Sequence, residues 1–267
     1  MGSNAGSDEL AGRDERASPE VVEATLKSLE ILRNLKEEGS ATLTELASRL
    51  GYAKSTVYRH LATLESAGYV SETTGRYRIG FLYLDYGIHV REQNRLYQVA
   101  KPMIDDLSED LEEKVWLMAE ENGFGVFLYH ETPPHGVQTF TRDGYRAPLH
   151  AFAAGKAILA HISADRVEKI VSRRELTGLT EATITDENVL FEELERIRER
   201  GTAFNRTEAI QRVHGVGVPI LDEEEQPIGA LSVAGPANRL KGKYFEEELP
   251  ELLLGVANEI EVTLAYE

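Results

Sequence analysis

Residues 42–79, TLTELASRLGYAKSTVYRHLATLESAGYVSETTGRYRI, decide the fold of the N-terminal part of this chain. The stretch opens with a capping box, in which the Thr42 hydroxyl and the Glu45 carboxylate each satisfy a free amide of a new helix. Apolar residues then recur at helical spacing until Gly51, which ends the helix. A short turn leads into a further helix that ends near Ala67. Two short helices joined by a tight, glycine-containing turn predict a helix-turn-helix.

The second helix of the pair, residues 54–67, has the composition of a helix that reads the major groove of DNA. At 100° per residue, its apolar side chains gather on one side and its polar ones on the other. The inner side carries Val57, Leu61 and Leu64, and the outer side carries Ser55, Arg59, Ala62 and Thr63. Arginine can donate two hydrogen bonds to guanine, and hydroxyls reach phosphates or base edges. The start of the helix presents free amides that favour phosphate.

A basic β-hairpin is predicted directly after this helix. Residues 68–71 and 77–79 are strand-like, and the turn lies at residues 73–75. Arg76 and Arg78 can grip the DNA backbone or the minor groove. The sequence therefore predicts a winged helix-turn-helix. Its candidate DNA contacts are Thr42, Lys54, Ser55, Thr56, Tyr58, Arg59, Thr63, Arg76 and Arg78.

Other roles for these residues stay open at this point. Ser55 could instead be the N-cap of its helix, because serine is favoured there. Lys54 could be a solvated surface charge, and Tyr58 and His60 could pack at the edge of the domain.

Two segments precede the helix-turn-helix. Residues 1–17 are small, polar and aperiodic, and they predict a disordered tail. Ser18-Pro19 predicts the entry of a first helix, with a capping hydroxyl and a proline at the first helical position, and Gly39 ends it. The apolar stripe of this helix is expected at Val22, Leu26, Leu29 and Leu32.

The pattern changes after the hairpin. Residues 81–98 predict a linker helix between a DNA-binding domain at 18–80 and a C-terminal domain at 99–267. Helix-like and strand-like segments alternate in the C-terminal domain, so the fold class is α+β. Helices are expected at 101–113, 155–162, 165–173, 188–200 and 245–265. Strands are expected at 114–120, 124–130, 136–141, 215–221 and 227–233, the last two as an antiparallel hairpin.

Composition narrows the class of protein. The chain has no cysteine, which excludes disulfides and thiolate metal sites. No run approaches the roughly 20 apolar residues of a membrane span, so a cytoplasmic protein that does not enter membranes is expected. The net charge is −17, yet residues 51–80 carry four basic and two acidic side chains, a net charge of +2. A nucleic-acid contact surface is therefore expected in that segment.

The acidic excess itself has two readings. A soluble acidic protein that avoids nucleic acid would show it. A protein from a cytoplasm with very high salt, such as that of a halophilic archaeon, would show it too, because repulsion is screened beyond about 3 Å at 1 M salt.

Several ordered motifs resemble the IclR family of transcription regulators over residues 20–264. The N-terminal part contributes LTELASRLGYAKSTVYRHLATLESAGYV and RYRIG, the first of which would also fit Lrp-like or MarR-like regulators. The specific part lies further on: PLHAFAAGKAILA, LTGLTEATITD, ELERIRERGTAFNRTE, GVGVPILD and GALSVAGPANRL. These segments follow in the order and spacing of the IclR effector-binding domain.

The resemblance implies a transcription regulator of a catabolic or metabolic operon, either repressor or activator. It implies a GAF-like effector domain, a homodimer or homotetramer, and binding to double-stranded DNA at a palindromic operator. It further implies a small-molecule pocket between the AFAAGKA segment and the two late strands. Carried over position by position, the pocket residues are Thr139, Ala147, Ala153, Ala154, Asn205, Val213, Gly215, Ser232 and Ala234. Asn205 replaces an acid of some family members, and Ala234 stands where a hydroxyl can occur.

The effector is expected to be a small organic acid. The amides of Ala153, Ala154 and Gly155 open a helix, and a helix N-terminus favours a carboxylate. Four arginines in the segments bordering the pocket also suggest an anion, although they could merely balance nearby acids. They are Arg142, Arg146, Arg206 and Arg212.

Two other functions were weighed. An enzyme lacks support, because Lys156 follows Gly155 without the rest of a phosphate loop and no zinc-protease or nucleophile-elbow motif occurs. No catalytic residue, metal ligand or cofactor is therefore expected, although His150 and His214 border the inferred pocket. The alternative kept open is a protein-interaction module whose winged helix binds partners rather than DNA.

Overall fold

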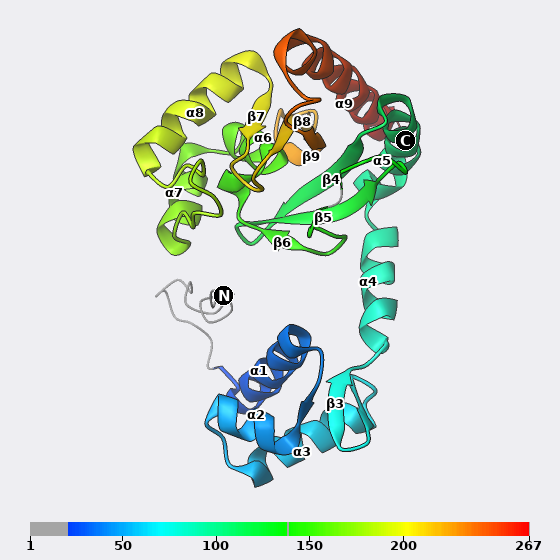
Figure 1. The fold of residues 1–267 in the computed structure, drawn as a ribbon, viewed down its shortest axis with the longest axis vertical. Helices are drawn as coiled ribbons and strands as arrows, with labels where there is room; N and C mark the ends of the chain where they lie inside the picture. Colours follow the sequence, from blue (N-terminus) through cyan, green and yellow to red (C-terminus); the bar gives the residue numbers. More distant parts are fainter. Residues whose placement is uncertain (1–20, 138, 267) are drawn as a thin grey trace. The chain divides into compact units, whose positions relative to one another are not determined.

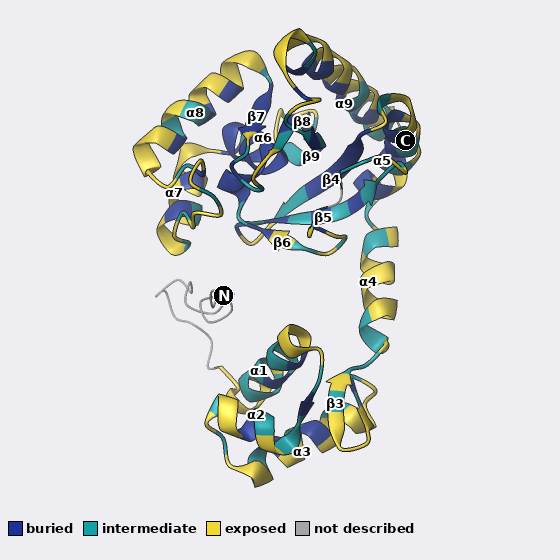
Figure 2. Cartoon of the chain, viewed as in Figure 1, coloured by how far each residue is buried: buried dark blue, intermediate teal, exposed yellow. Residues whose placement is uncertain are grey.

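The computed structural model describes residues 21–137 and 139–266 and divides the chain into two compact units, residues 1–90 and 91–267 (Figure 1). The expected tail at residues 1–17 and the helix entry at Ser18-Pro19 lie outside the described residues. Each unit has its own buried core (Figure 2). No described helix is long and apolar enough to cross a membrane.

The N-terminal unit is a winged helix-turn-helix, as predicted. Its elements are α1 (Glu23–Glu38), β1 (Ala41–Thr42), α2 (Leu43–Leu50), α3 (Lys54–Ser66), β2 (Val70–Thr73) and β3 (Arg76–Ile79). Strand β1 was not predicted; it pairs with β3 and gives a three-stranded sheet of order β1-β3-β2. Only two residues long, β1 is too short to produce an alternating pattern in the sequence.

Local signals explain this unit. Both halves of the capping box form, since Thr42 Oγ1 accepts from the Glu45 amide at 3.2 Å and the Thr42 amide donates to Glu45 Oε2 at 2.7 Å. Gly51 ends α2 in the left-handed region, at φ +68°. The wing turns at Thr74 and Gly75, with φ +54° and +78°. Two consecutive positive φ angles suit a two-residue hairpin turn, whose twist matches that of the strands.

The predicted apolar stripe of the first helix is confirmed only in part, at its C-terminal end. Helix α1 begins at Glu23, after an extended Val22 without a side-chain cap. Its buried residues are Ile31 and Leu35, whereas Val22 and Leu29 of the predicted stripe are exposed. The core contact of the helix comes mainly from its second half, through the four-residue step from Ile31 to Leu35.

The single linker helix predicted at residues 81–98 is two helices. Helix α4 (Leu82–Glu92) ends before Asn94, whose side chain accepts from the Tyr97 amide at 3.0 Å and caps α5 (Arg95–Leu111). Helix α5 begins six residues before the helix predicted at 101–113, and Pro102 lies inside it. Proline removes one helical hydrogen bond; here the surrounding core contacts of α5 hold the helix together.

The C-terminal unit is a mixed α+β domain around one antiparallel sheet. Its strands are β4 (Lys114–Glu121), β5 (Phe124–Glu131), β6 (Arg146–Ala147), β7 (Ala203–Arg206), β8 (Val213–Leu221) and β9 (Pro227–Pro236). Its further helices are η1 (Leu149–Ala151), α6 (Ala153–His161), α7 (Ala164–Arg173), α8 (Glu187–Arg200), η2 (Tyr244–Glu248) and α9 (Leu249–Tyr266). The strand order is β6-β5-β4-β9-β8-β7.

Most elements predicted for this unit are confirmed, including the β8–β9 hairpin. The strand predicted at 136–141 is wrong, since the described residues of that segment form no strand, and β5 pairs instead with the short β6. Strand β7 was missed because its four residues follow a helix directly, after Gly201.

The sheet divides the core of this unit into two layers. Helices α5 and α9 cover one face, and α6, with α8 beyond it, covers the other (Figure 1). On β4, Val115 and Leu117 point to the α5–α9 layer, whereas Trp116 and Met118 point to the α6 layer. This alternation with a period of two places Lys114 on the α6 side as well.

Candidate nucleic-acid interface and ligand pocket

Helix α3 presents a basic, solvent-exposed face. Val57 and Leu61 are fully buried, and Lys54, Ser55, Arg59 and Thr63 are exposed (Figure 2). Among the described residues, no hydrogen bond or ion pair engages the charged ends of Lys54 and Arg59. These two cations are therefore available to an anionic partner.

Four other residues predicted to contact DNA also have structural partners, among them Thr63, whose hydroxyl donates to the Arg59 carbonyl at 2.9 Å. Thr42 caps α2 with its hydroxyl. The Arg76 guanidinium donates to Ser40 Oγ and to the Ser40 carbonyl and lies 3.4 Å from a Glu45 carboxylate oxygen. Arg78 donates to Ser71 Oγ at 3.0 Å. The wing arginines are thus held in place by the domain while their residues remain exposed.

The structure decides the alternative roles left open for three residues of α3. Ser55 is not a cap, because Ala53 occupies the N-cap position without a side-chain bond. His60 does pack inward, with its Nδ1 2.8 Å from Ser28 Oγ on α1. Tyr58 points outward and is 56% exposed, so it belongs to the outer face.

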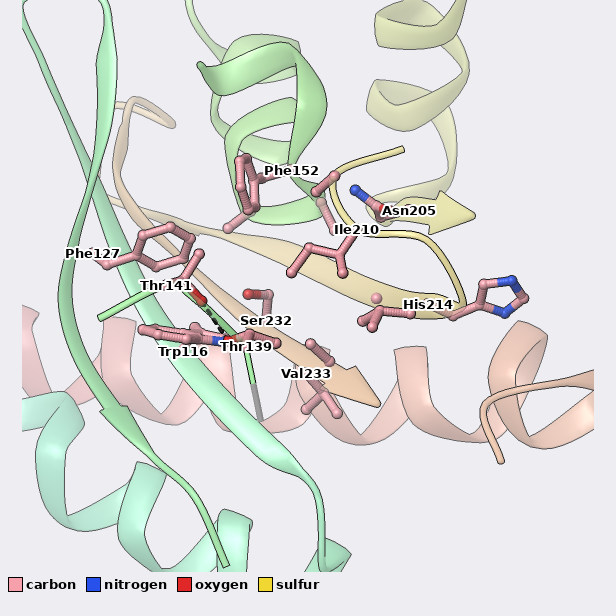
Figure 3. A pocket seen from close by; sticks show the side chains of 16 residues that line it. Trp116, Phe127, Thr139, Thr141, Phe152, Asn205, Ile210, His214, Ser232 and Val233 are labelled. Atoms are coloured by element: carbon pink, nitrogen blue, oxygen red, sulfur yellow. Dashed lines mark hydrogen bonds between the residues drawn. The ribbon is translucent and has the colours of Figure 1, made fainter. Parts of the chain in front are cut away.

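A partly open cavity lies in the C-terminal unit beside the start of α6 (Figure 3). The walls come from β4, β5, β7, β8 and β9, from the start of α6, and from the loops at 139–141 and 207–212. They are formed by Trp116, Phe127, Thr139, Thr141, Phe152, Ala153, Ala154, Asn205, Ala209, Ile210, Val213, His214, Gly215, Ser232, Val233 and Ala234.

Eight of the nine predicted pocket residues line this cavity, and Ala147 does not. Ala147 is fully buried on β6, where it pairs with Gly125 of β5. The aromatic walls Trp116, Phe127 and Phe152 were not predicted. The alternation along β4 could have indicated which face of the sheet Trp116 points to. Its place in the cavity, however, depends on the pairing of β4 with β9, which brings Trp116 opposite Ser232.

Asn205 is fully engaged with its own domain. Its Nδ2 donates to the Ala151 carbonyl at 2.5 Å, and its Oδ1 accepts from the Glu208 amide at 3.0 Å. The amide therefore ties the 207–212 loop to η1, just before α6. It also forms part of the cavity wall.

Close backbone packing fixes the start of α6. A Cβ at Gly217 of β8 would lie 2.5 Å from the Ala153 carbonyl carbon and 2.6 Å from the Ala154 nitrogen. Gly155 meets the Leu149 backbone just as tightly. The glycine of the AFAAGKA segment thus serves the packing of α6 on η1.

A buried ion pair holds the loop that closes one side of the cavity. Lys156 Nζ lies 2.6 Å from Glu208 Oε2, with the two side chains 1% and 10% exposed. The Glu208 carbonyl also accepts from the Thr183 hydroxyl at 2.6 Å. Lys156, which had resembled a fragment of a phosphate loop, is therefore a structural cation facing its own carboxylate.

None of the four arginines expected near an anionic ligand lines the cavity. Arg206 pairs with Glu246, and Arg142 donates to the Asp143 carbonyl. Arg146 lies over the Phe124 ring, and Arg212 is exposed on the outer side of its loop. The argument for an anion from these residues was wrong, because sequence proximity to the cavity did not turn their side chains into it.

Of the two histidines predicted to border the pocket, one lines the cavity and the other does not. His214 lines the cavity, and its Nδ1 hydrogen-bonds the Leu240 carbonyl. His150 is buried beneath α6 and bonds the Thr177 carbonyl at 3.1 Å. Burial lowers the pKa of His150 from its ordinary value, the Thr177 carbonyl opposes this, and nearby Lys156 adds to it. No metal-binding group of three His, Asp or Glu occurs within residues 21–137 and 139–266.

A helix-turn-helix unit with an exposed basic helix, followed by an α/β unit with a mainly apolar cavity, is the build of a two-domain transcription regulator. Family comparison agrees. Residues 24–73 match the IclR helix-turn-helix domain, and residues 88–262 match the bacterial transcriptional regulator IclR C-terminal domain. The chain belongs to the IclR family of transcriptional regulators, and the resemblance seen in its motifs is confirmed.

Individual relatives support this membership. The chain is 32% identical over 250 residues to the "Probable HTH-type transcriptional regulator ArcR" of Halobacterium salinarum, covering 92% of this chain and 95% of that protein. It superposes on the Thermotoga maritima IclR crystal structure with a TM-score of 0.73 and 30% identity, over 91% and 98% of the two chains. An IclR homologue of Microbacterium hydrocarbonoxydans, in complex with 4-hydroxybenzoate, shares the fold at a TM-score of 0.78, 23% identity and 91% and 100% coverage.

Proposed function

We propose that this protein regulates a metabolic operon by binding a palindromic operator with α3 and the wing, under control of a small organic acid in the C-terminal cavity. The observation that carries the proposal is the exposed face of α3. Its Lys54 and Arg59 have no partner among the described residues, in a chain with a net charge of −17. An unpaired basic strip on an acidic protein is the footprint expected for phosphate and base contacts.

Capture of source-genome fragments on the purified protein, at both low and molar KCl, tests this function. The wild type should enrich one or a few palindromic sites. The double variant Lys54→Ala, Arg59→Ala should lose them. The matched control is Lys169→Ala, Arg173→Ala on α7, which removes the same charge from another exposed helix and should retain them.

Failure of every preparation to enrich a site would contradict DNA recognition. The winged helix would then be a protein-interaction module. Enrichment that survives in the α3 double variant would place the DNA contact elsewhere on the protein.

A small acid is the ligand that the cavity supports best. Its walls are mainly apolar and aromatic, with a few hydroxyls, which is the usual make-up of a site for a small organic molecule. The cavity lies beside the amide-rich start of α6, which favours an anionic group. The 4-hydroxybenzoate of the Microbacterium structure is itself an aromatic acid.

A chain of contacts leads from the cavity wall to the end of α4. Trp116 stacks on His130 with ring centroids 4.4 Å apart, and the His130 Nδ1–H donates to Asp143 at 2.6 Å. Asp143 also accepts from Arg91, on the last turn of α4, at 2.8 Å. We infer that a ligand resting on Trp116 acts on α4 through these groups and so alters the spacing of two recognition helices in an oligomer, which operator half-sites fix at about 34 Å.

Asp143→Asn tests this coupling. The variant should bind ligand and operator separately but lose most of the effect of one on the other. Equal coupling in the variant and the wild type would exclude this route.

The surface of α4 supports a homodimer or homotetramer. Phe81, Leu84 and Ile88 follow one another at helical spacing and are 84%, 62% and 38% exposed. Exposed apolar patches of this kind mark interaction surfaces. Sedimentation equilibrium should show an oligomer for the wild type and a smaller species for Leu84→Glu.

A further inference from the structure

One buried lysine lies behind the wall of the cavity, against the lining residues Trp116 and Thr139, without a carboxylate partner. Lys114 begins β4 and is 3% exposed. It lies opposite Ala234 of β9, a small residue that lines the cavity. Its Nζ sits 4.3 Å from the centre of the Trp116 ring and 3.2 Å from Thr139 Oγ1. No carboxylate among the described residues comes within ion-pair distance of it.

The buried Lys114 ammonium has more hydrogen-bond donors than the described residues accept. It has three N–H donors, and only Thr139 Oγ1 accepts from it among the described residues. Burial lowers the pKa of Lys114 from its ordinary value, while the charge of Asp143 partly opposes that effect. Lys156, the other buried lysine among the described residues, is paired with an acid, Glu208. A cation left in this state favours an anion close by.

Two threonines extend this charge into the cavity. Thr139 Oγ1 accepts from Lys114 and lies 2.6 Å from Thr141 Oγ1 (Figure 3). If the Thr139 hydroxyl donates to Thr141, the Thr141 proton is free to donate into the cavity, which Thr141 lines. A cation at the head of such a row aligns all of its hydroxyl dipoles in one direction. Ser232 adds a further hydroxyl on the neighbouring strand.

We propose that Lys114, acting through the Thr139 and Thr141 hydroxyls, makes this corner of the cavity the binding site for the carboxylate of the ligand. The proposal rests on the proposed function, since it specifies how the same cavity recognises its effector. Lys114 selects a ligand by charge, whereas Phe127, Phe152 and Ile210 on the remaining walls contact its apolar body.

Trp116 is the only tryptophan of the chain, so its fluorescence reports on this corner directly. The probes are iodide, caesium and acrylamide, which quench tryptophan and carry negative, positive and no charge. Total salt is held constant at high KCl, where the surface charge of the protein is screened within a few ångströms. Acetate and acetamide serve as competitors that differ in charge but little in shape.

In the wild type, iodide should quench Trp116 more strongly than caesium despite the net charge of −17, and acetate but not acetamide should protect against iodide. Lys114→Met should lower the ratio of iodide to caesium quenching by about fivefold or more. Thr141→Val should lower it less. Lys114→Arg should retain it, because the charge remains, and acrylamide quenching should be similar throughout.

Several results would overturn the proposal. Stronger quenching by caesium in the wild type, equal ratios in Lys114→Met and the wild type, quenching by acrylamide alone, or no protection by acetate would each do so. The Lys114→Arg and Thr141→Val variants keep the test decisive if Lys114→Met unfolds. Genome capture by the same preparations separates the two claims, because loss of DNA enrichment by the wild type contradicts the proposed function and leaves the quenching result unaffected.

Discussion

Basic side chains stand in opposite environments in the two units of this protein. Lys54 and Arg59 on α3 are exposed and have no partner within the described residues. Lys114 and Lys156, beside the cavity, are 3% and 1% exposed. Positive side chains therefore serve two purposes in this protein. The exposed ones are available to bind a polyanion such as DNA, whereas each buried one needs a fixed anionic partner or an anionic ligand.

The largest effect is expected at the buried pair of Lys156 and Glu208. Lys156→Met leaves Glu208 buried without its cation, so it should lower the free energy of unfolding of the C-terminal unit by about 3–5 kcal/mol. Urea denaturation followed by Trp116 fluorescence measures this unit in the intact chain. Lys169→Met on exposed α7 is the control and should change stability by less than about 0.5 kcal/mol. Similar stabilities of the two variants would contradict the claim that the buried lysine stabilises the fold and the exposed one does not.

An exposed charge should act on binding and leave stability unchanged. Arg59→Ala should weaken binding to a captured site by about 1–3 kcal/mol, roughly 5- to 150-fold, because arginine on a recognition helix contacts base edges. Fluorescence anisotropy with a labelled site measures the affinity. Arg33→Ala on α1 is the matched control. Loss of thermal stability in Arg59→Ala would show that this side chain has a structural role.

A smaller effect is expected from His150 as the pH changes. Burial lowers its pKa in the folded protein, so below about pH 6.5 the unfolded chain binds a proton that the folded one does not. Stability should therefore fall as the pH drops from 6.5 towards the folded pKa, with a slope of at most about 1.4 kcal/mol per pH unit from this group. The wild type should lose more stability between pH 7.5 and 5.5 than His150→Gln. Exposed His89→Gln should follow the wild type; identical curves for all three would exclude this role.

The two regions also differed in how far they could be predicted from sequence. The face of α3 was predicted correctly, because helical periodicity alone decides which side chains of a short helix point outward. The family resemblance gave eight cavity residues, six of them in the AFAAGKA segment and the two late strands. Lys114 and Trp116 could not be assigned to the cavity, since their place there depends on the pairing of β4 with β9, more than 100 residues apart in sequence.

The arginines show the limit of reasoning from proximity along the chain. Arg206 borders the cavity in sequence, yet its guanidinium pairs with Glu246 and lies 5.0 Å from the centre of the Phe245 ring. Alternation along a short strand leaves the direction of a long flexible side chain open until its neighbours are known. Burial, rather than residue type, identified the cation that matters at the cavity.

The salt dependence of binding to a captured site, measured for Lys54→Met and Lys114→Met without ligand, tests the central claim most directly. The two variants lose the same group from the two environments. Lys54→Met should reduce the slope of log affinity against log salt concentration by about 0.9, the value for one lost phosphate contact, and Lys114→Met should leave the slope unchanged. An unchanged slope for Lys54→Met, or a reduced one for Lys114→Met, would contradict this division between DNA contact and ligand recognition.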